Sequence, residues 1–367
     1  MRILVLNWRD LAHPLAGGAE VYVQEMARRW VAWGHQVILV CGGYAGGKDA
    51  ETVDGVRVIR RGGRFTLYVR AALEYILRLS RECDVILDIE NGIPFFSPVY
   101  ARRPTVIVVH HVHREQIFVE AGFPLNWIAS VLETKVMPAA YRRCTFVTGT
   151  PSTREGLIAL GIAAPRIAMI PYGLDHGQYR PSEVKSPTPT ILYLGRLKRY
   201  KRLDLLVRAM PQILRTYPEA SLWIVGRGDA RGEIERRVRD LGLSRQVTFW
   251  GFADEREKVR LLQQAWVFVS PSMNEGWGLS VLEANACGAP AVVFDVPGLR
   301  DAVVDEQTGF VVPDGDLEGL SRKMALILED APLRQRLRGN AVAWAQRFNW
   351  EDSARSLLRV LEEARST

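Results

Sequence analysis

The stretch from Ser270 to Asp295, SPSMNEGWGLSVLEANACGAPAVVFD, constrains the fold of this chain more than any other part of the sequence. Apolar runs at residues 265–269 and 291–294 predict two buried parallel strands, and the segment from about Leu279 to Ala286 predicts a helix between them. Such a βαβ unit binds its ligands where the carboxyl ends of the strands meet the N-termini of the helices. The free N–H groups near Leu279 favour an anion, so the sequence predicts a phosphate-binding turn here.

Two glycines and two carboxylates surround the start of this predicted helix. Gly276 and Gly278 let a bound group approach the backbone because no Cβ atom stands in the way. A phosphate would repel Glu275 and Glu283, so we expect both carboxylates to accept hydrogen bonds from uncharged hydroxyls, such as those of a sugar and a ribose. The alternatives are a solvated loop acid at Glu275 and a capping box, Ser280-x-x-Glu283, at the helix start.

The spacing Glu275-x7-Glu283 within PSMNEGWGLSVLEANACGAPAVV resembles the donor-site signature of the retaining glycosyltransferases of family 4. The resemblance implies the GT-B fold, an α/β architecture of two Rossmann-like, doubly wound domains that face a central cleft. It also implies that Glu275 contacts hydroxyls of the transferred sugar and that Glu283 holds the ribose of the nucleotide.

A second donor-site pattern follows the strand predicted at residues 191–194. There, Gly195-Arg196-Leu197 is followed by Lys201. An Arg side chain can bind two phosphate oxygens in a bidentate manner, and a Lys side chain acts as a point charge. Alone, this segment is typical of a solvated basic loop. Together with the two glutamates it resembles the G-R-L-x3-K motif of family 4, which implies that Arg196 and Lys201 bind the diphosphate. Arg202 stands where the family commonly has Gly.

The resemblance adds further donor contacts. Gly226 and Phe252 follow two more predicted strands and would frame the nucleobase. Gly17 and Gly18, in a GGAE loop, would face the donor phosphates, or they simply make the turn. The DxD string at residues 314–316 is interpreted as a loop away from a strand end, because GT-B enzymes generally work without the metal that such a motif would hold.

The first half of the chain carries a run of histidines after a buried parallel strand predicted at residues 105–109. The resemblance places an active-site histidine here and assigns it to His110, with His111 as the second choice; the alternative is a structural histidine. A metal site is not expected, because no cysteine or second histidine cluster lies nearby. The acceptor-side candidates at this edge are Glu90, His111, His113 and Arg114.

The length of 367 residues predicts two domains, each large enough for its own core. The Pro-rich segment RPSEVKSPTPT favours a linker between them. The predicted divisions are an acceptor-binding domain at 1–180, a linker at 181–190, a donor-binding domain at 191–347 and a closing helix at 348–367 that crosses back to the first domain.

Charge, cysteine content and hydrophobicity indicate which binding partners and which cellular location to expect. The formal net charge is +7, yet no basic run is typical of a nucleic-acid-binding arm, so no nucleic-acid partner is expected. The four cysteines form no CxxC pair, which favours a reduced, cytoplasmic protein. No apolar stretch reaches the roughly 18 residues of a transmembrane helix.

One predicted helix, at about residues 66–80, is amphipathic and basic. Leu67, Ala71, Tyr75 and Leu79 form its apolar stripe, and arginines lie elsewhere on it. Such a helix can lie on an anionic membrane, although a solvated polar face is the favoured interpretation. Peripheral contact of the first domain with the inner membrane face therefore stays open.

The resemblance to family 4 implies a retaining, metal-independent glycosyltransferase without a cofactor. It would move a sugar from a nucleotide-sugar donor, a UDP- or GDP-sugar, to a glycan, lipid-linked or small-molecule acceptor, as in polysaccharide biosynthesis. In this scheme His110, Arg196, Lys201 and Glu275 are the catalytic candidates, and the cations stabilise the departing diphosphate. The alternatives are a nucleotide-sugar epimerase or hydrolase of the same fold and a non-catalytic subunit that binds a sugar nucleotide.

Overall fold

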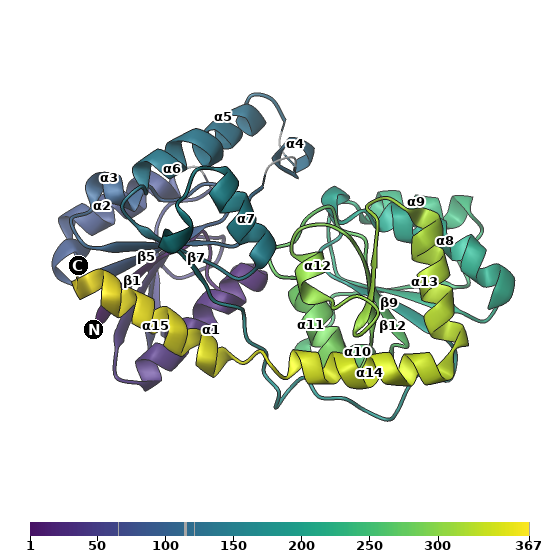
Figure 1. Ribbon diagram of the computed structural model, residues 1–367. Coiled ribbons are helices and arrows are strands. Elements are labelled where there is room, and N and C mark those ends of the chain that lie inside the picture. The colour runs from purple at the N-terminus through teal and green to yellow at the C-terminus, as the bar shows by residue number, and fades with distance from the viewer. Residues whose placement is uncertain (65, 114–115, 121, 367) are drawn as a thin grey trace. The chain divides into compact units, whose positions relative to one another are not determined.

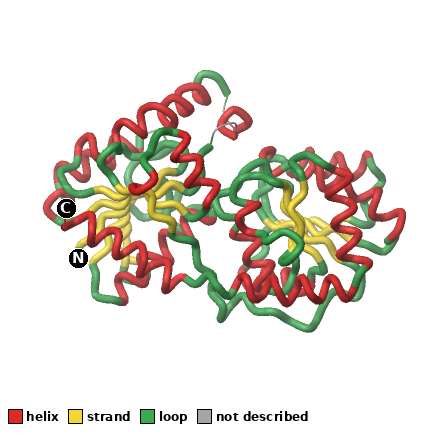
Figure 2. The backbone as a smooth tube through the Cα atoms, viewed as in Figure 1, coloured by secondary structure: helices red, strands yellow, loops and turns green. Residues whose placement is uncertain are grey.

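The computed structural model describes residues 1–64, 66–113, 116–120 and 122–366, and these form two compact units (Figure 1). The first unit comprises Met1–Gly173 together with Trp350–Thr367, and the second comprises Leu174–Asn349. In each unit, a layer of strands is covered by helices (Figure 2). Both units are therefore parallel-sheet α/β domains, as the sequence predicts.

The first unit contains an eight-stranded sheet in the order β3-β4-β2-β1-β5-β6-β7-β8. All pairs are parallel except the edge pair of β3 and β4. Because β1 lies between β2 and β5, the chain winds outward in both directions from β1, and the loops after β1 and β5 emerge side by side. The strands are β1 (Arg2–Leu6), β2 (Gln36–Cys41), β3 (Ala50–Val53), β4 (Val56–Arg60), β5 (Val85–Glu90), β6 (Thr105–Val109), β7 (Thr145–Thr148) and β8 (Ile167–Met169).

The helices of this unit bury apolar stripes against the sheet. In α1, Tyr22, Val23, Met26 and Trp30 recur at helical spacing and are almost fully buried. The predicted stripe of α2 is confirmed, since Leu67, Ala71, Tyr75 and Leu79 are also buried. The helices are α1 (Gly18–Ala32), α2 (Leu67–Leu77), α3 (Ser97–Tyr100), α4 (Gln116–Glu120), α5 (Leu125–Val131), α6 (Met137–Ala140), α7 (Pro151–Ala159) and α15 (Trp350–Ser366), with a π-helical turn at Leu132–Val136.

The last helix, α15, belongs to the first unit although it follows the second unit in sequence. It packs against α1, where the Trp30 indole donates a hydrogen bond to the carbonyl of Ala354 at 2.9 Å. The rings of Tyr22 and Trp350 also lie 6.2 Å apart. The predicted return of the closing helix to the first domain is therefore present in the structure.

The second unit contains a six-stranded parallel sheet in the order β11-β10-β9-β12-β13-β14. The strand order switches between β9 and β12, so the loops that follow these two neighbouring strands emerge together. The strands are β9 (Thr190–Leu194), β10 (Ser221–Val225), β11 (Val247–Gly251), β12 (Val267–Ser270), β13 (Ala291–Phe294) and β14 (Gly309–Val312). The helices are α8 (Leu203–Thr216), α9 (Arg231–Asp240), α10 (Glu255–Gln264), α11 (Leu279–Ala286), α12 (Leu299–Ala302), α13 (Leu317–Glu329) and α14 (Ala331–Ala345).

The cysteines Cys41, Cys83, Cys144 and Cys287 are all free thiols, and three of them are buried. None of the helices that the structure describes is long and apolar enough to traverse a bilayer.

Candidate functional site

Lys201 and Glu275 meet at the carboxyl edge of the second sheet. Lys201 follows β9 and Glu275 follows β12, and because these strands are neighbours the two side chains form an ion pair. The Ser272 hydroxyl donates a hydrogen bond to the same carboxylate oxygen, Oε1, at 2.7 Å. The structure therefore brings together the two motifs that the sequence analysis assigns to the diphosphate and the sugar.

Both side chains of this pair lie in a largely enclosed position. The side chains of Lys201 and Glu275 are only 12 % and 18 % exposed. Burial lowers the pKa of Lys201, but the Glu275 carboxylate outweighs burial, and the pKa lies above its ordinary value. A cation is thus fixed at the point where the sheet edge would meet an anionic ligand.

Arg196 lies beside Lys201 through a shared tyrosine. Its guanidinium donates a hydrogen bond to the Tyr200 hydroxyl at 3.0 Å, and the Lys201 ammonium lies 5.0 Å from the centroid of the Tyr200 ring. Arg196 itself is exposed. One cation is therefore anchored by a carboxylate while the other faces solvent.

The predicted glycines after β9 and β10 let backbone segments pack against each other. The Gly226 N–H donates to the Gly251 carbonyl at 2.7 Å, and the Gly195 N–H donates to Val225 at 3.0 Å. A Cβ atom on Gly226 would lie 1.9 Å from the Gly195 carbonyl oxygen, which no side chain allows. Next to these turns, Phe252 is 68 % exposed, with the Arg227 guanidinium 5.3 Å from its ring centroid.

Helix α11 begins at Leu279, as predicted, after Gly276 and Gly278. Gly278 adopts a φ of 62°, a left-handed conformation that suits glycine, and its missing side chain leaves the first N–H groups of the helix without a side-chain cap. The alternative of a capping box is wrong, because Glu283 does not fold back to the helix start. Its carboxylate instead pairs with Lys258 of α10 at 3.2 Å.

The Glu283–Lys258 pair belongs to a larger polar cluster. Lys258 also pairs with Glu255 at 3.0 Å and lies 5.0 Å from the ring centroid of Tyr179. Burial lowers the pKa of Lys258, but Glu283 and Glu255 outweigh burial and raise it. Glu283 is thus a nearly buried carboxylate that is held by a charged lysine.

In the first unit, His110 is buried at the end of β6. Its Nδ1 is hydrogen-bonded to the Tyr172 hydroxyl, and its Nε2 is buried without a hydrogen-bond partner among the described residues. Burial lowers the pKa of His110 to about 3, with a smaller contribution from His113. The imidazole is therefore neutral near pH 7.

Gly17 and Gly18 lie at the start of α1, after β1. Gly17 is the N-cap, and its N–H donates to the Glu20 carboxylate at 2.7 Å, so the acid of the GGAE loop caps its own helix. Gly18 is the first helical residue.

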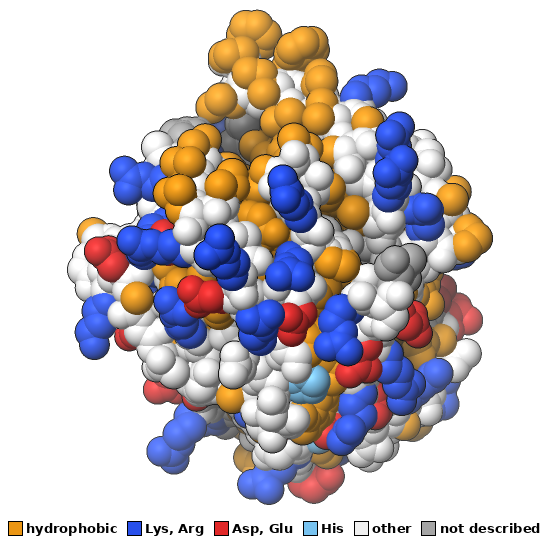
Figure 3. All heavy atoms as spheres, turned by 90° about the vertical axis from the view of Figure 1, so that its left-hand side faces the viewer, with side chains coloured by type: hydrophobic (Ala, Val, Ile, Leu, Met, Phe, Trp, Pro, Cys, Tyr) orange, Lys and Arg blue, Asp and Glu red, His pale blue; other side chains and the backbone are white. Residues whose placement is uncertain are grey.

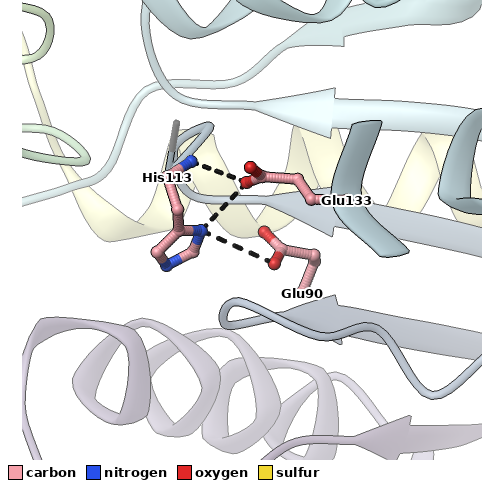
Figure 4. Close-up of side chains that lie close together, drawn as sticks. All are labelled: Glu90, His113 and Glu133. Atoms are coloured by element: carbon pink, nitrogen blue, oxygen red, sulfur yellow. Dashed lines mark hydrogen bonds and ion pairs between the residues drawn. The ribbon is translucent and has the colours of Figure 1, made fainter. Parts of the chain in front are cut away.

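Three side chains from different segments converge next to the histidine run (Figure 4). Glu90 ends β5, His113 follows β6, and Glu133 lies in the π-helical turn. His113 Nδ1 lies 3.1 Å from Glu133 and 3.8 Å from Glu90, and the His113 backbone N–H donates to Glu133 at 2.6 Å. Burial raises the pKa of Glu90 to about 7, and the two carboxylates outweigh burial to raise that of His113.

His111 lies beside His113. The rings of His111 and His113 lie 4.1 Å apart between centroids. Arg114 lies outside the described residues. The structure thus brings together Glu90, His111 and His113, three of the four residues proposed from sequence.

Comparison with known proteins covers nearly the whole chain. Residues 177–344 match the family "Glycosyl transferases group 1", and residues 17–173 match the "Glycosyl transferase 4-like domain". The chain belongs to the family 4 glycosyltransferases. Among the curated relatives of this glycosyltransferase, the glycogen synthase of Mycobacterium tuberculosis (strain CDC 1551 / Oshkosh) is 26 % identical over 395 residues, which cover 98 % of this chain and 94 % of the relative.

Solved structures confirm the GT-B fold of the glycosyltransferase. A sucrose-phosphate synthase from Thermosynechococcus elongatus aligns with a TM-score of 0.84 and 23 % identity, covering 99 % of this chain and 98 % of that one. HepE of Anabaena, in complex with UDP-glucose, aligns with a TM-score of 0.80 and 20 % identity, covering 99 % and 100 %.

One loop of the glycosyltransferase differs from the sequence interpretation. The sequence predicts Asp314 in a loop away from any strand end, but it follows β14 closely and pairs with Arg202 at 2.5 Å. The strand escapes prediction because GFVV is only four residues long and lies before a Pro-containing turn.

Sequence reasoning also missed several residues of this site. Lys258 is one of several charged residues in α10, and its spacing carries no signal that points to Glu283. Glu133 lies in a segment for which no element was predicted. Tyr172, the partner of His110, follows a strand end in the sequence PYGLD, and that position was the one available signal.

Proposed function

We propose that this glycosyltransferase moves a sugar from a nucleotide-sugar donor, a UDP- or GDP-sugar, to an acceptor hydroxyl with retention of anomeric configuration. The observation that carries the proposal is the ion pair of Lys201 and Glu275 beside the N-terminus of α11. The UDP-glucose complex of HepE supports a uridine nucleotide as the first donor to test.

The donor binds so that charges and hydroxyls are matched. Lys201, the exposed Arg196 and the free N–H groups at Leu279 receive the diphosphate. The phosphate then competes with Glu275 for Lys201, which frees carboxylate oxygens to accept hydrogen bonds from the sugar hydroxyls. Glu283, which Lys258 holds in place at 3.2 Å, accepts a hydrogen bond from the ribose.

The transfer step breaks the bond between the sugar C1 atom and the diphosphate oxygen and forms a bond between C1 and the acceptor oxygen on the same face. The bonding electron pair leaves with the diphosphate, whose oxygen then takes the proton of the acceptor hydroxyl. Arg196, Lys201 and the helix N-terminus stabilise the developing negative charge. With these groups in place, we propose that the step requires no metal ion and no cofactor.

His110 and the neighbouring edge of the first unit serve the acceptor and the reacting sugar in this proposal. A neutral imidazole can donate or accept one hydrogen bond without adding charge next to a carbocation-like centre. Its buried Nε2, which lacks a hydrogen-bond partner among the described residues, supports this role.

Calorimetric titration with UDP, GDP and their glucose and mannose conjugates in EDTA tests the donor site. We expect one nucleotide to bind, and Lys201→Ala to weaken its binding at least tenfold because a buried cation is lost. Glu283→Gln should weaken binding by about 1–3 kcal/mol, the contribution of a hydrogen bond to a charged group. Lys198→Ala is the matched control, because Lys198 lies in the same loop but pairs with Asp229 at 2.6 Å.

Equal binding by Lys201→Ala and Lys198→Ala would contradict the donor site. Product analysis separates the alternatives: an epimerase or hydrolase converts the donor without any acceptor, whereas a binding subunit leaves it intact. A transferase forms product only with an acceptor, and nuclear magnetic resonance of the new anomeric centre reports retention.

We further propose that the acceptor is lipid-linked and that the first unit contacts an anionic membrane. The outer side of α2 is not the purely solvated polar face that the sequence favours. It exposes Val69, Leu73, Ile76 and Leu77. The described residues 118–119 and 122–128 also expose apolar side chains, namely Phe118, Val119, Phe123, Leu125, Trp127 and Ile128. Apolar side chains gather at one end of the face in Figure 3, and α2, α3, α5 and α6 lie along one side of the sheet in Figure 1.

Cations accompany this apolar surface. Lys and Arg side chains lie next to the apolar groups in Figure 3, and Arg70, Arg78, Arg102 and Lys135 are exposed on or beside these helices. Burying apolar side chains among acyl chains while arginines meet anionic headgroups is the pattern of interfacial binding.

Vesicle co-sedimentation tests the membrane surface. The wild type should bind vesicles that contain phosphatidylglycerol and bind pure phosphatidylcholine vesicles much more weakly. The double variant Leu73→Ser/Leu77→Ser should lose most of this binding without loss of nucleotide affinity, because both side chains are exposed. Val184→Ser, which changes an exposed valine of the second unit, is the control. Unchanged sedimentation of the double variant would contradict the proposed surface.

A further inference from the structure

Glu90, His113 and Glu133 form a cluster in which two carboxylates and one imidazole point toward one another. All three side chains point toward one common region in Figure 4, and one ligating atom from each can be chosen so that the three lie within 4.8 Å of one another. They come from the end of β5, the loop after β6 and the π-helical turn, so no local turn geometry accounts for their meeting.

The cluster is almost closed to solvent. The side chains of Glu90 and Glu133 are 0 % and 2 % exposed, and that of His113 is 15 % exposed. The Glu90 Oε2 atom is buried and lacks a hydrogen-bond partner among the described residues. Burying two carboxylates next to one imidazole is unfavourable unless positive charge compensates them.

We propose that Glu90, His113 and Glu133 bind one divalent first-row transition-metal cation, of the class of Zn²⁺ or Mn²⁺. The donor set supports this class, because carboxylate oxygen and imidazole nitrogen without thiolate suit these ions. Ligand atoms that each lie about 2.1 Å from one ion are about 3–4 Å apart. The separations of 3.1 Å and 3.8 Å from His113 Nδ1 to the two carboxylates fall in this range.

The site departs from the sequence expectation that no metal is bound, and it is independent of the proposed metal-free donor chemistry. The ion ties together three segments of the edge that carries His110. Three protein ligands leave at least one coordination position open, which takes an oxygen from water or from an acceptor.

Metal analysis of the full chain tests the proposal. Protein that has been stripped with EDTA is dialysed against Zn²⁺ or Mn²⁺, and bound metal is counted by mass spectrometry and titrated by calorimetry. We expect one equivalent per chain. Glu90→Gln, Glu133→Gln and His113→Ala should each weaken binding at least tenfold, whereas His35→Ala, which removes an imidazole elsewhere in the first unit, should not.

Circular dichroism of the stripped proteins verifies that each variant is folded, and the conservative Glu→Gln changes keep the test valid if His113→Ala does not fold. Wild type that binds no more metal than the Glu→Gln variants would overturn the proposal and leave a cluster that shares protons instead. Nucleotide titration of the same samples keeps this result apart from the donor-site proposal, since either site can fail alone.

Discussion

Arg202 departs from the family pattern at a position where the backbone itself favours glycine. Its φ is 49°, in the left-handed region, yet its side chain makes several hydrogen bonds. The guanidinium donates to the carbonyls of Pro271 and Ser272 at 3.0 Å and 2.9 Å and pairs with Asp314. These bonds hold the loop after β12, which carries Glu275, to the loop after β9.

We therefore expect Arg202→Ala to destabilise the second unit more than Arg202→Gly does. Both variants lose the hydrogen bonds of a charged guanidinium, and such bonds contribute about 1.5–3 kcal/mol each. Only the glycine relieves the left-handed strain of about 1 kcal/mol. Urea unfolding measures both variants; an alanine variant as stable as wild type would show that these bonds do not brace the loop.

Among single residues, the sequence could predict those that lie in long motifs, but it could not predict the side chains that contact them. Glu275, Glu283, Arg196 and Lys201 are identifiable because their spacing is specific. Lys258 and Glu133 are not, because they reach the site from helices that are remote in sequence and lack any motif. Only the tertiary packing places Lys258 and Glu133 next to the residues that they contact.

Among the elements, the turn between β13 and α12 sets the position of the Glu275 backbone. Gly298 has a φ of 78°, and a Cβ atom there would lie 2.1 Å from the Glu275 carbonyl oxygen. The Glu275 N–H also donates to the Pro297 carbonyl at 3.1 Å. This turn and the glutamate loop thus approach as closely as their backbones permit.

Gly298→Ala should therefore both destabilise the second unit and weaken nucleotide-sugar binding, because the alanine displaces the Glu275 backbone. Gly315→Ala is a matched control, since Gly315 has a φ of 79° but a Cβ atom there would meet no described atom within 4 Å. Thermal unfolding and calorimetry compare the two variants. If both behave alike, left-handed strain alone accounts for the effect and the close approach is irrelevant.

Helices and strands were predictable where the hydrophobic pattern and the length of the segment both indicated the same kind of element. Helix α11 and strand β13 have the predicted bounds, and the strand predicted at 265–269 is observed as Val267–Ser270. The segment from α4 to α6 was not predicted, because its short helices and π-helical turn expose Phe and Trp side chains and show no clean amphipathic period. Strand β3 was missed because AETV, an exposed antiparallel edge, lacks a buried apolar run.

At the scale of the whole molecule, each unit has its own sheet and core, and the first unit is completed by α15. Leu357 of α15 is fully buried, and α15 contacts β5, β6 and β7 as well as α1. The helix is therefore part of the first core.

Leu357→Ala should destabilise the first unit by about 2–5 kcal/mol, the usual effect of a cavity in a core. The second unit should unfold as before, and a bound nucleotide should raise only its transition, because a ligand stabilises the unit that binds it. Calorimetric scanning with and without UDP separates the two transitions. Arg359→Ala, on the less buried side of α15, is the control, and equal effects of both changes would contradict the role of α15 in the core.

The return of α15 also sets the order in which the nascent chain can complete its parts. Residues 174–349 are contiguous and precede α15, so the second unit has emerged completely from the ribosome before the last residues of α15 emerge. The first unit begins to emerge earlier but must wait for α15, with the α1 surface that receives Trp350 and Ala354 uncovered until then. The part made first is therefore finished last, and its exposed α1 surface is where we expect chaperones to bind during synthesis.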